Sequence, residues 1–123
     1  MSGPGISGSL PKGDANGIGP VVRMLIDEPH RFHVILSIID CKKVTTDNDT
    51  GEVVPTARIR RIEVVLRDDL PVAEQLMRRA LESRNGRTVL PLDLEDDMRL
   101  AFRQIDPRTG ERLDGQDGED GDG

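Results

Sequence analysis

The pattern of hydrophobic and polar positions predicts a β-hairpin in the middle of the chain. Two apolar-rich runs, Phe32–Thr45 and Val53–Arg67, contain many β-branched residues, which favour strands. Between them, residues 46–52 are dense in Asp, Asn, Thr and Gly, which favour turns. Because two such runs joined by a short polar turn pair side by side, the pattern predicts an antiparallel hairpin.

The register of this hairpin follows from aligning the apolar positions of the two runs. Pairing Val44 with Val53 leaves the residues after Arg60 and Arg61 out of phase. One extra residue at this arginine pair, a β-bulge, restores the alternation. The alignment then predicts one apolar face made of Phe32, Val34, Leu36, Ile38, Ala57, Ile59, Ile62, Val64 and Leu66.

The opposite face of the predicted hairpin is mixed, but it holds an apolar cluster of Ile35, Ile39 and Val65. A sheet face that is open to water is expected to be more polar than this. We therefore expect the N-terminal segment or another subunit to cover it. Ile35, Ile39 and Val65 are the predicted self-association residues.

Helical spacing follows the hairpin. In Leu70–Ser83 apolar residues recur every three or four positions, and Asn85 with Gly86 ends the pattern. A second helix is predicted to begin at Asp93 and to stop before Pro107. Residues 20–26 are expected to form a short strand, with a short helix as the alternative.

Together these elements predict an α+β fold. It consists of an antiparallel two- or three-stranded meander with a long hairpin, packed on two helices. The folded part is small, so it buries only part of its surface and gains stability from a partner or a second copy.

Glycine and charge placement set the predicted domain limits. Of 13 glycines, six lie between positions 3 and 19 and five between 110 and 123, and glycine loses the most backbone entropy on ordering. We predict a flexible Gly-rich arm over 1–19, a single α+β domain over 20–106 and an acidic flexible tail over 107–123. Residues 20–104 carry 14 basic and 15 acidic groups, so the net charge of −6 comes mainly from the tail.

Cysteine usage and hydropathy bear on the compartment. Cys41 is the only cysteine, which excludes a disulfide scaffold and fits a buried, inert thiol in a reducing cytoplasm. No run reaches the ~18–20 apolar residues of a membrane-spanning helix. We therefore expect a cytoplasmic location and no membrane partner.

Four groups of residues resemble catalytic or metal sites in part. They are the nuclease-like Asp27 with Asp40 and Lys42, the calcium-loop-like Asp47, Asp49 and Gly51, the metal-ligand types His30, His33 and Cys41, and the acidic run Asp93, Glu95, Asp96 and Asp97. Their spacing departs from the motifs or is explained by a turn, a strand surface or a helix start. The sequence predicts no enzyme, no cofactor, no metal and no small-molecule substrate.

The basic side chains of the hairpin are the remaining candidate site. They are Lys42, Lys43, Arg58, Arg60, Arg61 and Arg67. A basic β-ribbon can grip phosphates, but a near-neutral core and a scarcity of aromatic residues weaken the case for nucleic acid. The leading hypothesis is a non-enzymatic binding module for a protein partner or itself. The alternative is a nucleic-acid-binding accessory protein whose binding is tuned by the acidic tail.

One segment carries a resemblance in style. Residues 57–102, ARIRRIEVVLRDDLPVAEQLMRRALESRNGRTVLPLDLEDDMRLAF, resemble small uncharacterised proteins encoded by phages of high-GC actinobacteria. The resemblance covers about 30–105, includes no catalytic motif and assigns no functional residue. It implies a cytosolic accessory factor.

Overall fold

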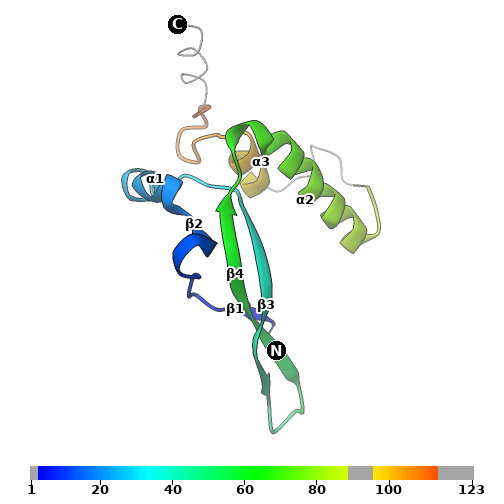
Figure 1. Cartoon of the computed structure of the whole chain (residues 1–123). Coiled ribbons are helices and arrows are strands. Elements are labelled where there is room, and N and C mark those ends of the chain that lie inside the picture. Colours follow the sequence, from blue (N-terminus) through cyan, green and yellow to red (C-terminus); the bar gives the residue numbers. More distant parts are fainter. Residues whose placement is uncertain (1–2, 89–95, 114–123) are drawn as a thin grey trace, which may run out of the picture. The chain divides into compact units, whose positions relative to one another are not determined.

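The computed structural model describes residues 3–88 and 96–113. Contacts between Cα atoms divide the chain into two compact units, which we describe separately. The hairpin unit comprises Met1–Pro20 and Ile35–Val64, and the helical unit comprises Val21–Val34 and Val65–Gly123 (Figure 1). The predicted α+β class is confirmed. The predicted limits of a Gly-rich arm over 1–19, a single domain over 20–106 and an acidic tail over 107–123 stay predictions.

The predicted hairpin is confirmed. Strands β3 (Ile35–Thr46) and β4 (Val53–Val64) pair antiparallel. Backbone hydrogen bonds close the turn between them, because the amide of Asp47 donates to the carbonyl of Glu52 over 2.8 Å and that of Gly51 to Asp47 over 2.7 Å. The carboxylate of Asp47 also accepts from the amide of Asp49 at 2.8 Å, a common role for aspartate at turns.

Two short strands complete the sheet of the hairpin unit. Strands β1 (Gly5–Ile6) and β2 (Asn16–Gly17) run parallel to β4, with the 3₁₀ helix η1 (Gly13–Ala15) between them in sequence. Strand β4 therefore has β3 on one side and β1 and β2 on the other (Figure 1). The prediction of an antiparallel meander is wrong here. Glycine density led to the prediction of a flexible arm over 1–19, and strands of two residues leave no periodicity that would have revealed β1 and β2.

The bulge predicted at the arginine pair is confirmed. Ile39 pairs with Ile59, but the next residue of β3, Ile38, pairs with Arg61. Arg60 is thus the extra residue on β4. A second irregularity, not predicted, lies on β3 between Cys41 and Lys43.

The predicted apolar face is wrong on one strand. Because directly opposite residues share a face of the sheet, the observed pairing places on one face Ile35, Ile39, Ala57, Ile59, Ile62 and Val64. Leu36 and Ile38, predicted for this face, lie on the other. The turn pairs Thr46, and not Val44, with Val53. Together with the irregularity after Cys41, this shifts β3 relative to the predicted register.

The helical unit contains the longest helix. After the short α1 (Val22–Asp27), it holds η3 (Arg67–Asp69), α2 (Leu70–Asn85) and α3 (Asp96–Phe102). The predicted helix from Leu70 is confirmed, and Gly86 ends it in the left-handed conformation. Over 20–26 the expected strand is wrong and the alternative of a short helix is confirmed, since η2 (Gly19–Val21) and α1 occupy these residues. The predicted helix start at Asp93 lies outside the described residues.

The helical unit has a small hydrophobic core. Val34, Leu70 and Phe102 form its buried cluster, and Val65, Ala73, Met98 and Ala101 pack against them. A backbone hydrogen bond of 3.0 Å from Val65 to Val34 joins the two extended segments of the unit. Several apolar residues of α2 are exposed, namely Val72, Leu76 and Met77.

Candidate interaction surface

The hairpin unit leaves most of its apolar side chains open to solvent. Among the described residues of this unit, Ile62 alone is a buried hydrophobic side chain. Every residue of β3 is exposed, including Leu36 at 67%, Ile38 at 61% and Ile39 at 52%. Since these residues lie on both faces of β3, the described residues of the hairpin unit cover neither face of the strand.

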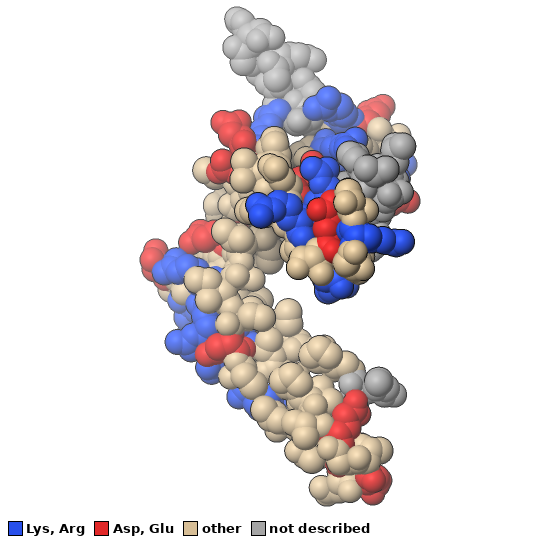
Figure 2. All heavy atoms as spheres, turned by 90° about the vertical axis from the view of Figure 1, so that its right-hand side faces the viewer, with Lys and Arg blue, Asp and Glu red and all other residues tan. Residues whose placement is uncertain are grey.

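β3 is also the open edge of the sheet. Within residues 3–88 and 96–113, its one pairing partner is β4. An edge strand presents a row of N–H and C=O groups that can pair with another strand. Figure 2 shows the hairpin unit mainly as uncharged residues, with Lys and Arg along one margin.

The structure keeps two of the three predicted self-association residues together. Ile35 and Ile39 are both exposed on β3 and share a face. Val65 belongs to the helical unit, where it packs partly buried against the hydrophobic cluster. Leu36 and Ile38 are exposed on the other face of β3, although the sequence pattern did not predict them as self-association residues. The signal was present, since the run Ile-Leu-Ser-Ile-Ile is apolar in both phases of a strand.

Two of the predicted basic residues gather around one carboxylate. Arg58 lies directly opposite Asp40 and donates from Nε and an Nη at 3.0 and 2.9 Å. Arg60 lies 3.8 Å from the same carboxylate. The hydrogen bond from Arg58 and the charges of both arginines hold the pKa of Asp40 below its usual value. These arginines are therefore partly neutralised within the sheet.

The other predicted basic residues are dispersed. Arg61 lies 3.1 Å from Glu63 and 3.5 Å from the carboxylate of Asp14. Lys42 and Lys43 are exposed on β3, whereas Arg67 lies in η3 of the helical unit. Residues 35–64 carry five basic and five acidic side chains. This segment therefore has no net positive charge with which to attract phosphate.

The buried thiol predicted at Cys41 is wrong. Cys41 is exposed on β3, and its Sγ lies 3.3 Å from the carbonyl oxygen of Lys43. The two-residue spacing spans the irregularity of β3 between Cys41 and Lys43. The bulge thus gives the thiol a local acceptor.

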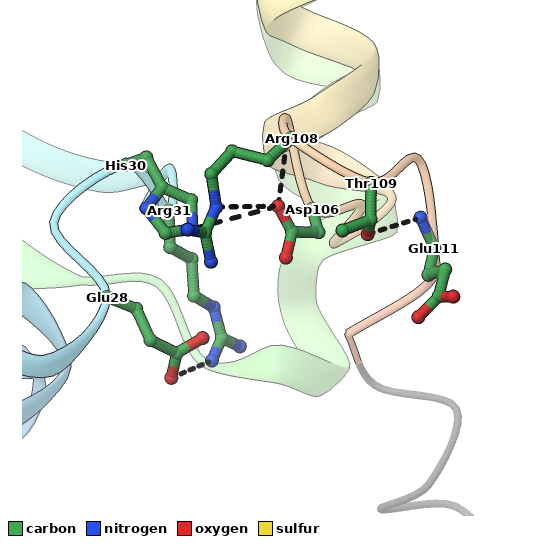
Figure 3. A network of polar contacts seen from close by, with 7 residues as sticks. All are labelled: Glu28, His30, Arg31, Asp106, Arg108, Thr109 and Glu111. Carbon is green, nitrogen blue, oxygen red and sulfur yellow. Dashed lines mark hydrogen bonds and ion pairs between the residues drawn. The ribbon is translucent and has the colours of Figure 1, made fainter.

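A polar network stabilises the chain after α3 in the helical unit (Figure 3). The carboxylate of Asp106 accepts the backbone amide of Arg108 at 2.8 Å and lies 3.7 Å from the His30 ring. Backbone hydrogen bonds, with the nearby His30 and Arg108 side chains, hold the pKa of Asp106 below its usual value. Arg31, next to His30 in the chain, donates a hydrogen bond of 2.8 Å to the side-chain oxygen of Gln104.

The residues of the candidate catalytic and metal groups are spread over both units. Asp27 lies in α1 of the helical unit and Asp40 in the hairpin unit. Across residues 3–88 and 96–113 no group of three or more His, Cys, Asp or Glu is placed to hold a metal ion. In the same residues no helix has the length and apolar character needed to cross a membrane. Asp93 and Glu95 lie outside them.

Comparison with known proteins adds no relative. No protein-family model, curated protein or solved structure matches the chain. Function therefore has to be argued from the residues themselves.

Proposed function

We propose that this chain is a non-enzymatic binding module that associates with a second copy of itself through β3 of the hairpin unit. The observation that carries the proposal is the exposure of all 12 residues of this apolar edge strand. Complete burial of a Leu or Ile side chain contributes about 1.5–3 kcal/mol. Leu36, Ile38 and Ile39 are each more than half exposed, so more than half of the surface of each could still be buried by a partner.

The sequence of β3 favours a second copy over an unrelated partner. In an antiparallel pairing with a two-fold axis at Ser37, Ile35 of each copy lies opposite Ile39 of the other, and Leu36 opposite Ile38. Such an interface is isologous, so each apolar contact occurs twice. Cross-strand pairs of this kind each contribute roughly 0.2–1 kcal/mol beyond Ala–Ala.

Charge supports the same partner. Because residues 35–64 carry equal numbers of acidic and basic side chains, the hairpins of two copies have no net charge with which to repel each other. The segment of β3 that would pair, Ile35–Ile39, contains no charged residue. A strongly basic or acidic partner would gain nothing from this segment.

The expected compartment is the cytoplasm. Cys41 is exposed on the same strand, four residues from the proposed axis. In a reducing compartment it stays a thiol and leaves the non-covalent pairing to the apolar residues.

Sedimentation equilibrium of the full chain tests the proposal. We expect a reversible dimer, and we expect Ile38→Lys to weaken it roughly tenfold or more, because the charge would lie opposite Leu36 of the second copy. Val44→Lys is the matched control. Val44 is 59% exposed on the same strand, close to the 61% of Ile38, but lies outside Ile35–Ile39.

Two outcomes would contradict the proposal. One is a chain that stays monomeric from about 1 μM to about 1 mM. The other is equal weakening by Ile38→Lys and Val44→Lys, which would place the contact away from the Ser37-centred pairing. Circular dichroism of each variant verifies that the strands remain folded.

Nucleic-acid binding is the second candidate. Its support is that Arg60, the bulged residue of β4, has a side chain that is 58% exposed, and that Lys42 and Lys43 are exposed at the irregularity of β3. Asp40 and Glu63 oppose it through their ion pairs. Affinity for a labelled DNA duplex that falls steeply between about 50 and 200 mM salt would favour this candidate.

A further inference from the structure

A pocket in the helical unit combines arginine side chains with an apolar wall. It has a volume of about 530 Å³, within the range of small-molecule sites. Its lining residues are Arg67, Leu70, Pro71, Glu74, Phe102, Arg103, Gln104, Ile105 and Arg112. All belong to the helical unit, and the proposed pairing through β3 uses none of them.

The apolar wall is part of the unit's own core. Leu70 and Phe102 are 6% and 7% exposed and belong to the buried cluster. Pro71 and Ile105 extend this wall within the pocket. An apolar group of a ligand would therefore contact side chains that cannot move far without disrupting the core.

The polar part of the lining is mainly cationic. Arg67, Arg103 and Arg112 are exposed, and Glu74 is the one acidic residue among the described residues of the lining. Arg67 and Arg112 already have interaction partners within the structure, so a ligand would extend or replace those interactions. Guanidinium groups form paired hydrogen bonds with carboxylate and phosphate oxygens.

The path of the backbone after α3 brings Arg103 and Arg112 into the pocket lining. After α3, Gln104 adopts φ 52, in the left-handed region that is unfavourable for most residues, and its side chain bonds to Arg31 and to the carbonyl of Ala101. The chain then turns back, so that Ile105 and Arg112 form a β-bridge. The amide of Leu113 donates to the carbonyl of Gln104 at 2.6 Å.

We infer that this pocket binds an organic anion, a carboxylate or a phosphate monoester that carries an apolar group. The apolar group packs on Leu70 and Phe102, and the anionic head is bound by the arginines. Glu74 lowers the formal charge of the lining but leaves the three arginines in excess, so the site still attracts an anionic head. A small organic anion and the acidic C-terminal segment of this chain both have this chemistry, and the last variant below distinguishes them.

Titration of the full chain with phenylbutyrate and with phenyl phosphate, followed by backbone amide NMR shifts, tests the inference. We expect saturable shifts at Phe102, Arg103 and Ile105. Inorganic phosphate lacks the apolar group and benzyl alcohol lacks the charge. Each is therefore expected to bind at least roughly fivefold more weakly than the two anions. Absence of saturable shifts at about 10 mM of either anion would overturn the inference.

Variants locate the binding. Arg103→Gln is expected to weaken both anions roughly tenfold. Arg79→Gln is the matched control, because Arg79 is an exposed arginine of α2 outside the pocket lining. Equal loss in the two variants would overturn the inference. Glu74→Gln is expected to tighten binding severalfold, which keeps the test decisive if Arg103→Gln does not fold.

One further variant identifies the source of the anion. Substituting Asp117→Asn, Glu119→Gln, Asp120→Asn and Asp122→Asn removes four carboxylates from the C-terminal segment. If that segment is the natural occupant, this variant binds the probes more tightly than the wild-type chain does. If probe affinity is unchanged, the occupant is another molecule, and the dimer test above is unaffected in either case.

Discussion

The two units of this protein use their apolar residues in opposite ways. The helical unit buries Val34, Leu70 and Phe102 in a cluster of its own. The hairpin unit spreads apolar residues over both faces of a long strand and buries Ile62 alone among its described hydrophobic side chains. Since burial of apolar surface is the main favourable term in folding, the helical unit has a source of stability that the hairpin unit has to obtain elsewhere.

The two units therefore offer two different kinds of surface. An exposed apolar strand such as β3 is typical of association, which is the role proposed for it above. A pocket built against a formed core, as in the helical unit, is preorganised for a smaller ligand. We therefore expect substitutions in one unit to affect the stability of that unit and not of the other.

The largest effect is expected in the core of the helical unit. Phe102→Ala removes a ring that is 7% exposed and should lower the free energy of unfolding by about 3–5 kcal/mol. Leu76→Ala, at a side chain 55% exposed on α2, should change it by less than about 0.5 kcal/mol. Urea unfolding measures both values. Similar losses for the two variants would show that the cluster is not the core of the unit.

A matched pair of glycines compares the units directly. Gly51 ends the hairpin turn at φ 78 and Gly86 ends α2 at φ 75, and an added Cβ would meet no atom within 4 Å at either position. Replacement by Ala should therefore cost about 1–2 kcal/mol through backbone conformation alone. Hydrogen exchange should show the loss for Gly51→Ala in β3 and β4 and for Gly86→Ala in α2. A loss that spreads over both units in each variant would mean that they unfold as one.

The smallest effect is a pH dependence confined to the helical unit. Burial of the His33 ring, followed by the charge of Arg31, lowers its pKa below the usual 6.5, while Glu28 acts in the opposite direction. Because the unfolded chain binds the proton more readily, His33 leaves stability unaffected above pH 6.5 and reduces it as the pH falls from 6.5 through the folded pKa.

Thermal unfolding of the wild-type chain and of His33→Gln, at about pH 7.5 and about pH 5.5, measures this term. The wild-type chain is expected to lose more stability on acidification than the variant does. An equal loss in both would assign the pH dependence to groups other than His33.

The hairpin and the long helix were predictable because their signals are local. A polar turn between two β-branched runs identified β3 and β4, and apolar spacing with a glycine stop identified α2. The bulge at Arg60 was also predictable, since the adjacent arginines interrupt the alternation of β4. Of the candidate surface, Ile35 and Ile39 were predicted, while Leu36 and Ile38 were assigned to the wrong face.

Turn chemistry and apolar period act over a few residues, so the amino-acid pattern predicted β3, β4 and α2 but not β1 or β2, and it left strand or helix open over 20–26. The tertiary structure alone decided the register of β3, since a strand that is apolar in both phases can pair in either. It also decided the parallel pairing of β1 and β2 with β4, and the return of the chain after Gln104 that places Arg112 beside Ile105. These features join residues far apart in sequence or depend on a single strained residue, and no local pattern encodes them.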